Sequence, residues 1–155
     1  MMTPNIRPMA PRDTAAVLDM ITALAAFHDD IAEIDEATLT MMTFGPVPCL
    51  KVLVAEGGAG LVGYAALMPT ARLHFGKIGL EMHHLFVKPR VRGSGVGRAL
   101  IAACRAEGLR RGCHYISVGT APDNLAAGAF YERRGFERHM MTAPRFRISL
   151  DQPLT

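Results

Sequence analysis

The chain has 155 residues, of which half are hydrophobic and a fifth are charged. This is the composition of one globular domain that is large enough to bury a core, so we expect a single domain over residues 1–155. A net charge of +3 is too small to indicate a nucleic-acid partner. No apolar run has the length of a membrane span, and no secretory signal is visible at the start.

The predicted elements, taken in chain order, form a mixed α/β pattern. A short strand, two helices and a hairpin with a glycine-rich turn come first, and strand–helix–strand alternation follows. The predicted helices cover residues 12–28, 35–44, 96–111 and 124–135. The predicted strands cover residues 5–9, 49–56, 61–69, 78–87, 113–119 and 145–150.

Charge is distributed unevenly along these elements. Between Asp13 and Leu50 there are seven acidic residues and no lysine or arginine, whereas between Lys88 and Arg111 there are seven basic residues and one acid. Such a division suggests one region for an anion and another for a cation. Two solvated helix faces of opposite sign would give the same pattern.

The three cysteines are scattered along the chain. Cys49, Cys104 and Cys113 are odd in number and lack the C-x-x-C spacing of a zinc site. This usage predicts reduced cysteines in a cytoplasmic protein, with neither a disulfide framework nor a metal site.

A glycine turn, "RGSGVG" at residues 92–97, stands between a predicted strand and a predicted helix. Glycine lets a ligand approach the main chain, and the free amides at a helix N-terminus bind anions. The turn therefore predicts a phosphate cradle, although a plain turn before a helix is the alternative. It contains no P-loop, and it is no dinucleotide fingerprint because Arg98 stands where the third glycine would be.

Two motifs together resemble the signatures of the GNAT superfamily of acetyl-CoA-dependent N-acetyltransferases. Arg92, Gly95 and Gly97 fit R/Q-x-x-G-x-G/A, and "NLAAGAFYERRGF" at residues 124–136 fits N-x-x-A-x-x-F-Y-x-x-x-G-F. "LAAFHD", "CLKVLVAE", "GKIGLEMHHLFVKP" and "FRISL" look closest to the diamine (spermidine/spermine-type) branch. The resemblance implies a mixed, mostly antiparallel sheet of about seven strands, flanked by about four helices.

The resemblance also implies acetyl-CoA as the cofactor. Backbone groups of residues 85–87 would pair with the pantetheine arm, and amides of residues 93–98 would hold the pyrophosphate, with the side chains of Arg92 and Arg98 nearby. The cofactor-binding residues expected in this way are Leu85, Phe86, Val87, Arg92, Gly93, Ser94, Gly95, Val96, Gly97, Arg98, Asn124, Ala127 and Tyr131.

The resemblance assigns an acid and points to a base for acetyl transfer. Tyr131 matches the tyrosine that protonates the departing thiolate in many relatives, and a tyrosine hydroxyl suits this role; a ring that only packs in the core is the alternative. Diamine acetyltransferases carry a glutamate where this chain has His83. An imidazole is a competent base at neutral pH, and Glu81 either orients it or acts through water. A neutral histidine with a backbone partner is the alternative for His83.

Strand geometry gives a further expectation for this site. On a regular strand side chains alternate, so Glu81, His83, Leu85 and Val87 share one face. His84 would point to the opposite face, and the adjacent histidines would then be unable to chelate a metal.

The acceptor is expected beside the junction of the first two helices. The residues expected to bind it are His28, Asp29, Asp30 and Glu33. Carboxylates there would suit a small cationic amine of the di- or polyamine kind, although acids that favour a helix start are the alternative.

Three functions are therefore compatible with the sequence. The leading one is an N-acetyltransferase that passes acetyl to a primary amine by direct attack. The others are a peptide or protein lysine or N-terminal acetyltransferase, and an acetyl-CoA-binding protein without turnover. Related folds commonly dimerise, and residues 145–150 read as an edge strand that needs a partner, so we expect a homodimer.

Overall fold

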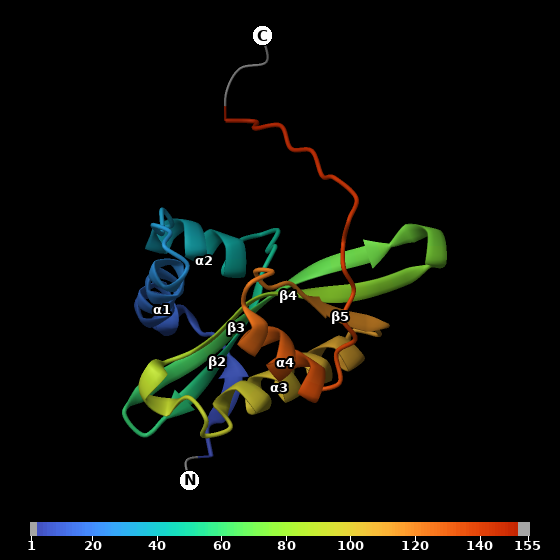
Figure 1. The fold of residues 1–155 in the computed structure, drawn as a ribbon. Coiled ribbons are helices and arrows are strands. Elements are labelled where there is room, and N and C mark those ends of the chain that lie inside the picture. The colour runs from blue at the N-terminus through green and yellow to red at the C-terminus, as the bar shows by residue number, and fades with distance from the viewer. Residues whose placement is uncertain (1–2, 152–155) are drawn as a thin grey trace. The chain divides into compact units, whose positions relative to one another are not determined.

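The computed structural model describes residues 3–151, and these separate into two compact units, one ending at Gly119 and one beginning at Thr120. Each unit is described by itself. The first contains a sheet in the order β1-β2-β3-β4-β5 (Figure 1). The expectation of one domain over residues 1–155 stays a prediction.

The sheet is mixed and mostly antiparallel, as predicted. Strands β1 to β4 pair antiparallel in sequence order, and β5 joins β4 in parallel. The strands are β1 (Asn5–Pro8), β2 (Lys51–Gly57), β3 (Gly60–Arg72), β4 (Lys77–Val87) and β5 (Tyr115–Val118). Gly57 and Gly60 bracket the tight turn between β2 and β3, where glycine was expected.

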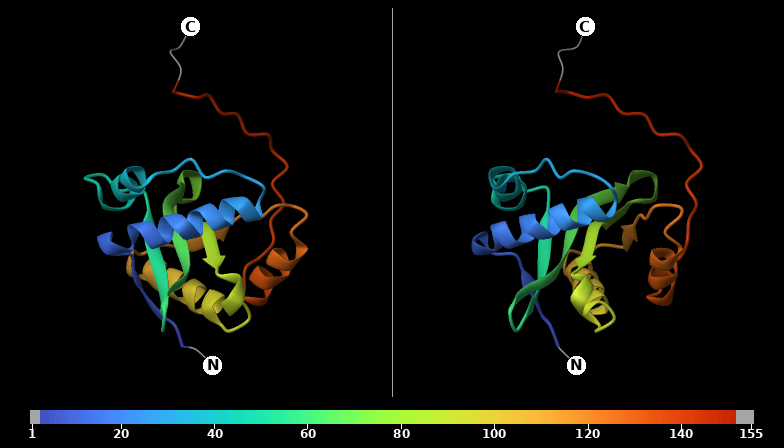
Figure 2. Two further views of the ribbon diagram at one scale, coloured as in Figure 1. Left: turned by 90° about the vertical axis from the view of Figure 1, so that its left-hand side faces the viewer. Right: turned by 60° about the vertical axis from the view of Figure 1, so that its left-hand side comes forward.

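Helices cover both faces of this sheet (Figure 2). Helices α1 (Thr14–Phe27) and α2 (Glu36–Phe44) lie on one face, and α3 (Val96–Arg110) lies on the other. Short 3-10 turns complete the unit: η1 (Pro11–Asp13), η2 (Leu73–Phe75) and η3 (Pro89–Val91). Within residues 3–151, none of the helices combines the length and apolar character needed to cross a membrane.

Alternation along β3 explains why both faces are covered. Tyr64 and Ala66 are buried in a cluster with Val17 of α1 and Leu39 of α2. On the other face, a Cβ added at Gly63 would lie 3.3 Å from the Leu100 side chain of α3. Because both faces of β3 are apolar, the strand requires a helical layer on each side.

A β-bulge interrupts the pairing of β4 with β3. Ala66 pairs with His84 and the next residue, Leu67, pairs with Met82, so His83 is the extra residue. Residues opposite one another share a face, so His84 joins Ala66 on the α1/α2 side while Met82 joins Leu67 on the α3 side. The expected regular alternation is therefore wrong at this point: His84 lies on the same side as His83, and Leu85 does not.

Strand β5 covers only part of the free edge of β4. It pairs with the segment from Gly79 to Met82 and no further. Within residues 3–151, residues 83–87 therefore have no neighbouring strand on that edge, and their outward backbone groups are open to a ligand.

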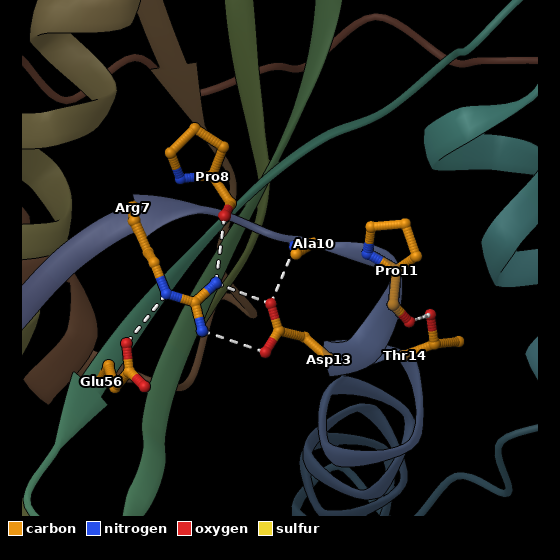
Figure 3. A network of polar contacts seen from close by, with 7 residues as sticks. All are labelled: Arg7, Pro8, Ala10, Pro11, Asp13, Thr14 and Glu56. Atoms are coloured by element: carbon orange, nitrogen blue, oxygen red, sulfur yellow. Dashed lines mark hydrogen bonds and ion pairs between the residues drawn. The ribbon is translucent and has the colours of Figure 1, made fainter.

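A partly buried ionic network joins the first strand to the first helix (Figure 3). The Arg7 guanidinium donates to both carboxylate oxygens of Asp13, at 2.7 and 3.0 Å, and to Glu56 of β2 at 2.9 Å. The Asp13 carboxylate also accepts the N–H of Ala10 at 2.7 Å and is only 6% exposed. Hydrogen bonding to Arg7 lowers the pKa of Asp13 and also that of Glu56.

The second unit contains α4 (Leu125–Arg133). Asn124 caps this helix, because its side-chain oxygen accepts the N–H of Ala127 at 3.1 Å. The ring of Tyr131 meets the rings of Phe130 and Phe136 edge-on, each with a centroid distance of 5.6 Å.

The strand expected over residues 145–150 does not form, which corrects that prediction. Phe146, Ile148 and Leu150 are exposed, and a strand is stable only where its backbone groups meet another strand. The described residues thus hold five strands rather than about seven, with four α-helices as expected.

Candidate active site

The glycine turn has the backbone that its sequence requires. Gly93 and Gly95 have φ angles of 79° and 95°, in the left-handed region that side chains other than glycine rarely adopt. Gly95 is the N-cap of α3. Within residues 3–151, no protein acceptor takes the N–H groups of residues 95–98. These amides converge at the positive end of the helix dipole, which fits a pyrophosphate.

Arg92 fastens this turn to the rest of the first unit. Its Nε donates to the carbonyl oxygen of Val87 at 2.9 Å. Its guanidinium carbon lies 5.6 Å from the ring centroid of Phe27, at the end of α1, and 6.0 Å from that of Phe86. The side chain thus positions the turn as well as adding positive charge beside it.

The open edge of β4 offers some of the expected backbone groups. Lys88 donates its N–H to Val62 of β3 at 2.8 Å, and in an antiparallel pair such residues alternate along the strand. Phe86 therefore bonds to β3, and its side chain is buried in the core. Leu85 and Val87 direct their backbone groups to the open edge, where the carbonyl of Val87 accepts from Arg92.

A cavity of about 420 Å³ lies between the sheet and the α1/α2 layer. Among the residues that the structure describes, its lining contains aliphatic and thioether side chains, one thiol, one phenol and two imidazoles, and no carboxylate. The lining residues are Val17, Ile21, Ile34, Leu39, Met42, Cys49, Leu50, Val52, Tyr64, Ala66, Met68, His83 and His84.

Both histidines of the bulge line this cavity. Their rings stack with centroids 4.5 Å apart, and the Tyr64 hydroxyl lies 2.9 Å from Nδ1 of His84. Burial, with a further contribution from the charges of His83 and His28, lowers the pKa of His84 to about 4. His84 is therefore neutral at physiological pH, while His83 remains exposed. The described residues contain no group of three side chains able to hold a metal ion.

Glu81, the other candidate base, is engaged elsewhere. Its carboxylate accepts a hydrogen bond from the hydroxyl of Ser117, its partner across the β4–β5 pair. It does not line the cavity. The structure thus brings His83, but not Glu81, to the cavity wall.

The residues expected to bind the acceptor lie outside the cavity lining. His28, Asp29, Asp30 and Glu33 are exposed in or beside the loop between α1 and α2; Ile34 is the residue of that loop that lines the cavity. Asp35 accepts the N–H of Thr38 at 2.7 Å and so caps α2, which is the helix-start role considered for these acids.

The remaining predicted site residues lie in the second unit. Tyr131 is half-buried, and burial raises the pKa of its hydroxyl, which keeps the proton available at neutral pH. Asn124 and Ala127 form the helix cap, a structural role that the motif alone did not indicate.

Two residues that line the cavity, Tyr64 and His84, were not predicted from the sequence to do so. Tyr64 stands in an apolar run that reads as plain core, and His84 was placed on the wrong face. Only the pairing register, which the sequence does not display, brings them together.

Comparison with known proteins gives consistent matches. The model of the acetyltransferase (GNAT) family matches residues 20–136. A thialysine N-epsilon-acetyltransferase from Sus scrofa is 28% identical over 84% of this chain and 82% of its own length. A mycothiol acetyltransferase from a Parafrankia strain is 31% identical over 96% of this chain, but over only 42% of its own length. A solved aminoglycoside N-acetyltransferase in complex with CoA has a TM-score of 0.77 at 19% identity, covering 96% of this chain and 97% of that one.

Proposed function

We propose, because this chain belongs to the acetyltransferase (GNAT) family, that it acetylates the primary amine of a small molecule by direct attack. Enzymes of this family use acetyl-CoA, so the expected family, enzyme class and cofactor are confirmed. The observation that carries the proposal is one juxtaposition in the first unit. Strand β4 and the turn after it provide three features: an unpaired strand edge, free amides at the start of α3, and the wall of the cavity that His83 lines.

The residues of the first unit fit the cofactor. When bound, acetyl-CoA supplies the acetyl group, and its thiol is the leaving group. Amides of residues 95–98 would hold the pyrophosphate, and the backbone of Leu85 and Val87 would hold the pantetheine arm as an added strand does. Arg98, exposed in the first turn of α3, adds positive charge beside these amides.

His83 is the base in this proposal. Its imidazole is exposed at the cavity wall, whereas the Glu81 carboxylate already accepts from Ser117. The neutral His84 stacks on His83 and is itself held by Tyr64, which fixes the ring that must take the proton from the ammonium. Tyr131 is the proposed acid, because its hydroxyl keeps its proton at neutral pH and can donate it to the departing thiolate.

The acceptor is a small amine in this proposal because side chains of α1, α2 and the sheet line the cavity and limit its size. A volume of about 420 Å³ is in the range of small-molecule sites. Carboxylates of Asp29, Asp30 and Glu33 are exposed outside it, where they add negative charge that attracts a cation to this part of the surface.

Thiol release from acetyl-CoA, measured against a panel of primary amines and lysine peptides, tests this function. We expect turnover with small amines well above the rate without amine. Turnover with peptides alone would favour a protein acetyltransferase. Calorimetric binding of acetyl-CoA without turnover of any acceptor would mean a non-catalytic protein, and the absence of both would overturn the proposal.

A further inference from the structure

We infer that the cavity selects acceptors that carry a single amine on an uncharged apolar body, and that it discriminates against diamines of equal length. This inference rests on the proposed function, since it names the substrate class of the same site. It departs from the di- or polyamine acceptor that the acidic segment suggested.

The wall of the cavity is apolar where it is deepest. Val17, Leu39, Val52 and Ala66 are at most 5% exposed, and all four line the cavity. The Tyr64 hydroxyl there is already paired with His84. A buried surface of this kind gains free energy by covering methylene or aromatic groups and offers nothing to a charge.

The polar groups of the lining are few. Besides Tyr64 and the Cys49 thiol, they are the two stacked histidines on β4, and His83 is the exposed one. An acceptor can therefore place one ammonium beside His83, where proton removal is needed, and must place the rest of its body against the aliphatic wall.

A second ammonium in that body would lose its water without gaining a partner. Within residues 3–151 no carboxylate lines the cavity, and the carboxylates of the segment between α1 and α2 are exposed outside it. Because an unpaired buried charge is strongly unfavourable, a diamine is disfavoured unless its second charge stays in solvent.

Matched amines test the inference. We expect kcat/KM for n-hexylamine to exceed that for 1,6-diaminohexane by ~10-fold or more, since one uncompensated charge costs at least that much. From n-butylamine to n-hexylamine, kcat/KM should rise by ~4-fold per methylene, because each additional CH₂ that is buried stabilises the bound state by that factor. Equal or faster turnover of the diamine would overturn the inference, whereas failure of every amine would count against the proposed function.

A charge placed in the wall should reverse the preference. Met42 lines the cavity, whereas its neighbour on α2, Met41, is 61% exposed and does not. Met42→Glu should raise the ratio of diamine to monoamine kcat/KM by ~10-fold or more, and Met41→Glu should leave it unchanged. The same shift in both variants would indicate a general surface-charge effect and would contradict the assignment.

A binding measurement separates the inference from catalysis. With methyl-¹³C methionine, we expect n-hexylamine to shift the signals of Met42 and Met68, which line the cavity, and not that of Met82. 1,6-Diaminohexane should need ~10-fold more ligand for the same shifts. These shifts would uphold the inference even if turnover were absent, and tighter binding of the diamine would overturn it.

Discussion

His83 and Glu81 make opposite predictions about the rate at limiting amine. A base must be unprotonated to act, so if His83 is the base the rate rises with pH, and His83→Ala removes this rise. His83→Glu should restore part of the activity, because it provides a carboxylate base at the same cavity wall. Comparison of pH–rate profiles for the three forms measures this.

Glu81→Gln is the matched comparison. It should cost less than His83→Ala, because the Glu81 carboxylate bonds to Ser117 rather than to the cavity. If the rate of His83→Ala still rises with pH, and Glu81→Gln loses more activity than His83→Ala, then Glu81 is the base and His83 is not. A loss below ~10-fold in both variants would remove both assignments.

Tyr131 is tested by the loss of one hydroxyl. Tyr131→Phe keeps the ring contacts with Phe130 and Phe136, so the fold and cofactor affinity should persist while turnover falls by ~10²-fold or more. Steady-state kinetics with the best amine, together with calorimetry for acetyl-CoA, measure both. Unchanged turnover would leave Tyr131 a packing residue.

At the scale of elements, the start of α3 makes the next prediction. Gly97 lies in the first helical turn, so Gly97→Val adds bulk beside the free amides without needing a left-handed backbone. We expect loss of acetyl-CoA binding by calorimetry with the fold retained. Ala102→Val, at an exposed position of the same helix, is the control and should bind normally; normal binding by both would mean that the pyrophosphate lies elsewhere.

The elements themselves were largely predictable, because periodicity and glycine punctuation are local signals. The helix of residues 12–28 is α1, and the strand of residues 78–87 is β4, each within two residues of the expected ends. The strand of residues 145–150 was not predictable in this way. Its alternation is visible in "RFRISL", but a strand also needs a partner edge, and no local pattern supplies one.

The site was predictable to the same extent. Motifs drew attention to the glycine turn, Tyr131 and His83 as candidates, because those signals lie within short segments. The cavity depends on residues from α1, α2, β2, β3 and β4, and its histidine pair depends on a bulge. Alternation cannot reveal an extra residue, which is why His84 was placed on the wrong face.

At the scale of the whole molecule, the Arg7–Asp13 network predicts acid sensitivity. The pKa of Asp13 is lowered in the folded state, so its contribution to stability is complete above the ordinary carboxyl pKa of ~4 and is lost as the pH falls through the lowered value. Arg7→Met should reduce the free energy of unfolding by ~2–4 kcal/mol at pH 7. Urea unfolding at pH 7 and pH 3 should show the difference shrinking toward acid.

Arg105→Met is the control for this measurement, since Arg105 is exposed and has no ion-pair partner within residues 3–151. It should unfold like the parent protein at both pH values. A difference between the parent and Arg7→Met that does not change with pH would mean that packing, rather than the carboxylate, accounts for the loss.

We propose that two copies of the chain associate through the C-terminal segment. Phe146, Ile148 and Leu150 are 94%, 70% and 83% exposed, and alternate apolar side chains on an unpaired backbone favour strand pairing with a second copy. Light scattering at micromolar concentration should give a dimer mass, and Phe146→Ser with Ile148→Ser should give a monomer. A monomer mass for the parent would contradict the proposal.

The bulge at His83 also has a genetic consequence. A single-codon deletion of His83 would leave Ala66 opposite His84 and Leu67 opposite Met82, so the pairing with β3 would become regular and the other residues of β4 would keep their faces. Such a deletion would remove the proposed base, and its stacking on His84, while the sheet stays paired. Drift in this gene should therefore be able to discard the base through a change in the length of β4 that leaves the strand intact.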